Sequence, residues 1–156
     1  KSLNIDSLIM AAPDMGGVHR AREYAKYFSV DMVICDKHRK RANEIESMQI
    51  IGDVEGKNVV LVDDIVDTAG TLSKAAQLIM DKGAESVRAF CTHPVLSGRA
   101  YERIEESVLT ELIVCDTIPL KRTSPKITAL PTAELFAKAI HKVYAYESIS
   151  PLFVKA

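Results

Sequence analysis

Short runs of consecutive apolar residues alternate along this chain with stretches whose apolar residues recur every three or four positions. An unalternated apolar run indicates a strand buried on both faces, and the longer spacing indicates an amphipathic helix. The runs predict strands at 7–12, 31–35, 48–54, 58–62, 87–92 and 112–115. The periodic stretches predict helices at 18–28, 71–82, 99–106 and 133–144. This alternation predicts a three-layer α/β fold, with a mostly parallel sheet and helices on both of its faces.

Two of the predicted helices have well-defined apolar faces. The face in 71–82 consists of Leu72, Ala75, Ala76 and Ile79. The face in 133–144 consists of Phe136, Ala139, Ile140 and Val143. We expect both faces to be buried against the rest of the fold. No internal repeat or long linker divides the 156 residues, so we expect residues 1–156 to form a single domain.

Charge and cysteine content exclude several classes of function. The net charge of -1 provides no field that would attract nucleic acid or an anionic membrane. The longest apolar runs are strand-sized, so we expect no membrane span, and the polar start 1–6 does not resemble a secretory leader. Cys35, Cys91 and Cys115 lack CxxC spacing and lie in apolar runs. We therefore expect buried, reduced thiols in a cytoplasmic protein.

The most informative stretch for chemistry is 59–71, at the end of the predicted strand 58–62. Asp63 and Asp64 follow the apolar run, and Thr68, Gly70 and Thr71 lead into the next helix. Free N–H groups at a helix start, with two nearby hydroxyls, suit a phosphate, while paired carboxylates suit sugar hydroxyls or Mg²⁺. Taken singly, the same residues also fit a solvated turn and an ordinary helix cap. Neither GxxxxGK[ST] nor GxGxxG occurs in the chain.

The stretch 62–71 resembles the phosphoribosyl-diphosphate loop shared by type I phosphoribosyltransferases and ribose-phosphate diphosphokinases, also called PRPP synthetases. Residues 12–21, APDMGGVHRA, resemble the (S/A)PDxGGxxRA segment of the diphosphokinases, and residues 36–44, DKHRKRANE, resemble their flexible catalytic loop. Further matches lie at 92–98, 116–120 and 147–153. The resemblance runs in one register from Ser7 to the C-terminus. It implies a type I phosphoribosyltransferase-like fold and corresponds to the C-terminal half of the family's two-domain subunit.

The resemblance implies an ATP-dependent enzyme of nucleotide biosynthesis. The family transfers the diphosphoryl group of ATP to the 1-hydroxyl of ribose 5-phosphate, with Mg²⁺, and gives PRPP and AMP. Its full-length members form homo-oligomers. Their N-terminal half supplies an Asp-Leu-His motif and most of the adenine site, which are absent from this sequence. We therefore expect this chain alone to be inactive or nearly so. The alternatives are a type I phosphoribosyltransferase and a non-catalytic regulatory relative.

The resemblance also assigns roles to individual residues. The ribose 5-phosphate site would consist of Asp63, Asp64, Asp67, Thr68, Ala69, Gly70 and Thr71. The diphosphate site would consist of Asp14, Gly16 and Gly17, and the metal ligands of Asp14, Asp63 and Asp64. Lys37 and Arg39 would be the catalytic cations that stabilise charge on the transferring group. By spacing alone, Asp14 also fits a turn after proline, and the run 36–41 also fits a solvated loop.

Overall fold

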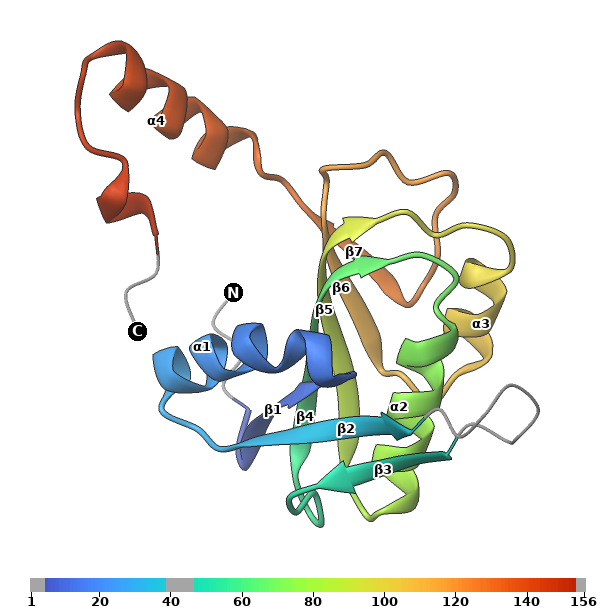
Figure 1. The fold of residues 1–156 in the computed structure, drawn as a ribbon. Coiled ribbons are helices and arrows are strands. Elements are labelled where there is room, and N and C mark those ends of the chain that lie inside the picture. The colour runs from blue at the N-terminus through green and yellow to red at the C-terminus, as the bar shows by residue number, and fades with distance from the viewer. Residues whose placement is uncertain (1–4, 39–46, 154–156) are drawn as a thin grey trace.

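The computed structural model describes residues 5–38 and 47–153, which form a seven-stranded sheet with helices around it (Figure 1). The strands are β1 (Leu8–Ala12), β2 (Met32–His38), β3 (Ser47–Ile51), β4 (Asn58–Val66), β5 (Ser86–Pro94), β6 (Glu111–Cys115) and β7 (Ile127–Leu130). The α-helices are α1 (Val18–Phe28), α2 (Gly70–Asp81), α3 (Ala100–Glu106) and α4 (Ala133–Tyr144). Short 3₁₀ turns lie at Met15–Gly17 and Ser150–Leu152.

The sheet has the strand order β3-β2-β1-β4-β5-β6-β7. Only β2 and β3 pair antiparallel, and all other neighbours are parallel. The chain builds outward from β1 on one side and then crosses to β4 on the other side of β1. In parallel sheets, ligands bind at the carboxyl ends of the strands beside such a reversal of strand order. The mostly parallel α/β architecture predicted from the sequence is confirmed.

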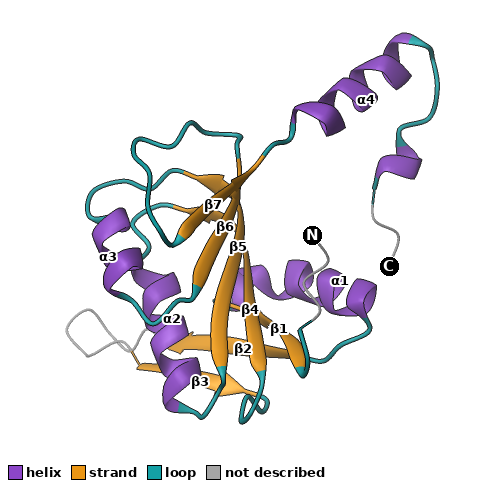
Figure 2. Ribbon diagram, turned by 180° about the vertical axis from the view of Figure 1, so that it is seen from behind, coloured by secondary structure: helices purple, strands orange, loops and turns teal. Residues whose placement is uncertain are grey.

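The sheet carries helices on both faces. Figures 1 and 2, which view the molecule from opposite sides, show α1 on one face and α2 and α3 on the other. The larger apolar core lies on the α2 side, where Leu61 of β4 packs with Ile79 of α2 and Ile104 of α3. The α1 side holds a smaller cluster around Met10, Ala25 and Val62. The predicted inner face of α2 is confirmed, because Leu72, Ala75, Ala76 and Ile79 are all buried.

Three strands extend beyond their predicted ends, including β5, which runs to Pro94, and one strand has no counterpart among the predicted ones. β4 continues through Asp63 and Asp64 to Val66, because Asp63, Ile65 and Val66 pair with β5. β2 continues to His38 through antiparallel pairing with β3, so the first residues of the loop predicted at 36–44 belong to a strand. β7 is short, and most of it is exposed, so no continuous apolar run marks it in the sequence.

The prediction that α4 buries its apolar face is wrong. Phe136, Ile140 and Val143 are 57%, 67% and 63% exposed, and no residue of α4 is buried. The chain leaves the edge strand β7 through Pro131 and Thr132, and α4 then projects away from the sheet (Figures 1 and 2). Helical periodicity identifies an apolar face but not the surface that covers it.

The cysteine prediction holds for two of the three residues. Cys35 and Cys91 are buried, Cys115 is half-buried, and all three thiols are free. Burial raises the pKa of the Cys35 and Cys91 thiols to about 11, which keeps both protonated and unreactive near neutral pH. Within the described part of the chain, no helix is both long and apolar enough to cross a membrane.

The two helices α2 and α4 offer a matched test of this packing. We expect Ile79→Ala to lower the free energy of unfolding by about 2–5 kcal/mol, because Ile79 is fully buried. We expect Ile140→Ala in exposed α4 to change it by less than about 0.5 kcal/mol. Urea unfolding of the two variants measures both values. An equal loss in the two variants would show that the face of α4 is covered in solution.

Candidate active site

Two loops meet where β1 and β4 end side by side. Ala11 pairs with Leu61 in parallel register, so the turn after β1 begins next to Asp63 and Asp64 of β4. Asp14 caps this turn, because its Oδ1 accepts the N–H of Gly17 at 3.1 Å. A Cβ on Gly17 would lie 3.3 Å from Pro13 Cδ and 3.6 Å from the Val62 carbonyl oxygen. The absence of a side chain at position 17 therefore lets the turn pack tightly against β4.

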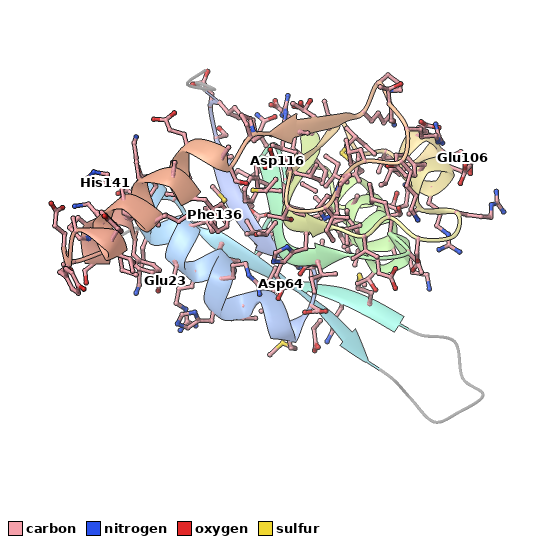
Figure 3. The ribbon with its side chains drawn as sticks, turned by 90° about the horizontal axis from the view of Figure 1, so that it is seen from above. Glu23, Asp64, Glu106, Asp116, Phe136 and His141 are labelled. Atoms are coloured by element: carbon pink, nitrogen blue, oxygen red, sulfur yellow. The ribbon has the colours of Figure 1, made fainter. Side chains whose placement is uncertain are left out.

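A carboxylate pair on β4 faces a cation from α1. Arg20 Nη2 lies 2.8 Å from Asp64 Oδ2, and Arg20 Nη1 lies 3.7 Å from Asp63 Oδ1. The Asp64 N–H also donates to Asp63 Oδ1 at 2.9 Å. Figure 3 shows Asp64 next to α1. Arg20 belongs to the segment 12–21, but the sequence assigned it no role, because only the fold places it over these two carboxylates.

The two carboxylates differ in their protonation. Burial, reinforced by the neighbouring Asp64 and Asp14 charges, raises the pKa of Asp63 from 3.8 to about 6. Burial also acts on Asp64, but its hydrogen bond with the Asp63 carboxyl and the charge of Arg20 outweigh it and lower its pKa. Near neutral pH both carboxylates are therefore mostly ionised. The charge on Asp63 is the less favourable of the two, because its carboxylate is the more buried one. Such a pair favours binding of a further cation or of hydroxyl donors.

Residues 67–71, which we call the anion loop, connect β4 to the start of α2. Ala69 holds a left-handed backbone with φ of 60°, and its side chain makes no capping hydrogen bond to the helix. The first N–H groups of α2 and the positive end of its dipole thus stay available for an anion. Asp67 and Thr68 are exposed, while Gly70 and half-buried Thr71 form the first turn.

The fold brings three of the predicted groups together at the carboxyl ends of β1 and β4. They are the turn 14–17, the carboxylate pair and the anion loop. Lys37 lies in β2, opposite Met48 of β3, and Arg39 lies outside the described residues. Among residues 5–38 and 47–153, no group of three or more His, Cys, Asp or Glu side chains is close enough to hold a metal ion. The adjacent carboxylates of Asp63 and Asp64 remain the best local set of oxygen ligands.

Together these features place a loop suited to an anion beside a pair of carboxylate acceptors. The anion loop offers N–H donors and hydroxyls, and the carboxylate pair offers acceptors beside it. The fold occurs in a purine phosphoribosyltransferase from Pyrococcus horikoshii, at a TM-score of 0.51 and 20% identity over 79% of this chain and 74% of that one. The chain thus has a type I phosphoribosyltransferase-like fold, as predicted.

Comparison of the sequence identifies the family. Residues 30–154 match the family model described as the phosphoribosyl synthetase-associated domain, and the chain belongs to this family. It is 54% identical to a ribose-phosphate pyrophosphokinase of Campylobacter jejuni over 99% of this chain and 50% of that protein. A solved phosphoribosylpyrophosphate synthetase from Mycobacterium smegmatis superposes at a TM-score of 0.83, with 34% identity over 90% of this chain and 46% of that one. The chain spans about half the length of the curated relatives it matches.

The raised pKa of Asp63 gives stability a defined pH dependence. The folded protein holds the Asp63 proton more tightly than the unfolded chain, so this contribution is complete below pH 3.8 and is lost as pH rises through about 6. Between these two values, each pH unit of increase lowers the free energy of unfolding by about 1.4 kcal/mol. We expect Asp63→Asn to flatten this fall, because the amide does not ionise. Asp64 acts in the opposite sense, because its pKa is lowered. It contributes stability above pH 3.8 and loses that contribution as the pH falls below this value.

Urea unfolding at intervals between pH 4 and 7 measures this effect. Asp81→Asn is the matched control, because Asp81 is an exposed carboxylate at the far end of α2. The account is contradicted if Asp63→Asn and the unmodified chain lose stability in parallel over this range.

Proposed function

We propose that this chain is the ribose 5-phosphate-binding domain of a ribose-phosphate diphosphokinase, and that residues 1–156 form one domain. The enzyme would transfer the diphosphoryl group of ATP to the 1-hydroxyl of ribose 5-phosphate and release AMP and PRPP. One observation carries the proposal: the Asp63–Asp64 pair and the anion loop lie at the same strand end in a member of this family. We propose the cytoplasm as its compartment, where free thiols stay reduced.

The site has complementary groups for both ends of ribose 5-phosphate. The N–H groups of the anion loop and the hydroxyls of Thr68 and Thr71 would donate to the 5-phosphate, helped by the positive end of the α2 dipole. Asp63 and Asp64 would accept hydrogen bonds from the ribose hydroxyls. Binding at both ends fixes the direction of the sugar, so that its 1-hydroxyl faces the turn 14–17. This orientation supplies the positional part of catalysis.

Mg²⁺ fits the chemistry of the donor set at the carboxylate pair. Magnesium in phosphoryl-transfer sites is held by one or two carboxylates together with substrate phosphates, so a three-carboxylate cluster is not required. Asp63 and Asp64 would hold the cation, and Asp14 would hold it on the diphosphoryl side, where Gly16 and Gly17 leave room for the backbone to approach. When bound, the ion neutralises charge on the diphosphoryl oxygens. Arg20 offsets part of the negative charge of the pair.

The transfer needs no covalent intermediate on the protein. The ribose 1-oxygen forms a bond to the β-phosphorus of ATP and gives up its proton to water. The bond from that phosphorus to the oxygen that bridges it to the α-phosphorus breaks, and AMP departs with the electron pair. Lys37 and Arg39 would stabilise the charge that spreads over the transferring oxygens. The adenine contacts would come from the other half of the enzyme and from neighbouring copies in its homo-oligomer. We therefore propose that these 156 residues bind ribose 5-phosphate but turn over little or none, and PRPP formation by them alone would contradict this part.

Binding of ribose 5-phosphate tests the proposal. We expect saturable binding to this chain in calorimetric titration with Mg²⁺, and about tenfold weaker binding in Thr71→Ala, because a hydrogen bond to a charged phosphate is lost. Thr110→Ala is the matched control, because exposed Thr110 lies at the amino end of β6, on the side of the sheet away from the site.

The absence of binding to the folded chain would contradict the proposed site. Equal losses in Thr71→Ala and Thr110→Ala would contradict the role of the anion loop.

A further inference from the structure

We infer that Arg103 of α3 is a positioning residue for the anion loop. The inference rests on the proposed function, because it concerns how that loop presents its N–H groups to the 5-phosphate. Arg103 lies outside the motifs at 12–21, 36–44, 62–71 and 92–98. The side chain comes from a neighbouring helix, and its guanidinium donates to the loop backbone at the Thr68 carbonyl.

The segment between β5 and α3, together with α3 itself, holds three consecutive carbonyl groups at the start of the anion loop. The bonds are Leu96 N–H to Val66 O at 3.1 Å, Ser97 N–H to Asp67 O at 3.0 Å and Arg103 Nη1 to Thr68 O at 2.8 Å. The Ser97 hydroxyl also donates to the Asp67 carboxylate. The next carbonyl, of Ala69, accepts from Ser73 within α2. Each carbonyl from 66 to 69 is therefore fixed by a donor.

Fixing these carbonyls also fixes the N–H groups on the opposite side. In a planar trans peptide the C=O of one residue and the N–H of the next point in opposite directions. Because the Thr68 carbonyl points to Arg103, the Ala69 N–H points away from α3. The same reasoning applies to the N–H groups of Asp67 and Thr68. The loop therefore has one side with bonded carbonyls and another side with N–H groups directed outward, as a phosphate requires.

The conformation that Arg103 holds is an unfavourable one for the chain alone. Ala69 has φ of 60°, a region that residues with a Cβ adopt only when their surroundings impose it. Arg103 bonds to the peptide that immediately precedes this backbone angle. The guanidinium is also close to the helix start, since a Cβ on Gly70 would lie 4.0 Å from Arg103 Nη1. Its positive charge adds to the field that favours an anion there.

Four variants test the inference by calorimetric titration with ribose 5-phosphate and Mg²⁺. We expect Arg103→Met to bind about tenfold more weakly than the unmodified chain, because a charged donor to the loop is lost. Arg103→Lys keeps one charged donor and should recover most of the affinity. Arg99→Met is the control, because exposed Arg99 lies four residues earlier, at the N-cap of α3, and it should bind normally. Ser97→Ala, which removes the hydroxyl donor to the Asp67 carboxylate but keeps the N–H donor to the Asp67 carbonyl, should also weaken binding.

Amide ¹H–¹⁵N spectra without ligand separate positioning from a general loss of structure. We expect Arg103→Met to shift the resonances of residues 67–71 and to leave those of β1, β2 and β6 in place. Normal affinity in Arg103→Met, or unshifted loop resonances, would overturn the inference while the proposed function stands. Failure of the unmodified chain itself to bind would instead count against the proposed function, and with it the inference.

Discussion

The parallel pairing of β1 with β4 is the contact on which both the core and the site depend. It joins two segments that are distant in sequence, and it sets α1 and α2 on opposite faces of the sheet. The register Ala11 to Leu61 brings the turn after β1 next to the carboxylates of β4. A shift of one residue would turn Asp63 and Asp64 to the wrong faces and would expose the apolar residues that precede them. The same pairing therefore buries the core and assembles the site.

The site is also where the fold bears unfavourable charge and backbone strain. Asp63 pairs with β5 inside the sheet, so its carboxylate is partly removed from water, and burial raises its pKa. Ala69 holds a left-handed backbone immediately before α2. The Arg20 guanidinium beside both carboxylates offsets part of the charge of the pair. The hydrogen bonds from the β5–α3 segment hold the backbone that precedes Ala69. Backbone strain and perturbed pKa values of this kind are concentrated at functional sites, where they prepare the site for its ligand.

The sequence was sufficient to predict the α/β architecture, the family and the ends of α1 and α4, because periodicity and motifs are local signals. It could not predict that Phe136 and Ile140 of α4 are exposed, because burial depends on what lies opposite a helix. The contacts of Arg20 with the carboxylates and of Arg103 with the Thr68 carbonyl could not be predicted for the same reason. Each side chain reaches its partner from another element, across a contact that only the folded chain creates.

The central claim is that the carboxylate pair and the anion loop hold opposite ends of one sugar phosphate. A crystal structure of the chain with ribose 5-phosphate tests it most directly. The account predicts the phosphate against the N–H groups of residues 69–71 and the ribose hydroxyls against Asp63 and Asp64. A sugar phosphate bound elsewhere, or bound with its phosphate toward the carboxylates, would contradict it.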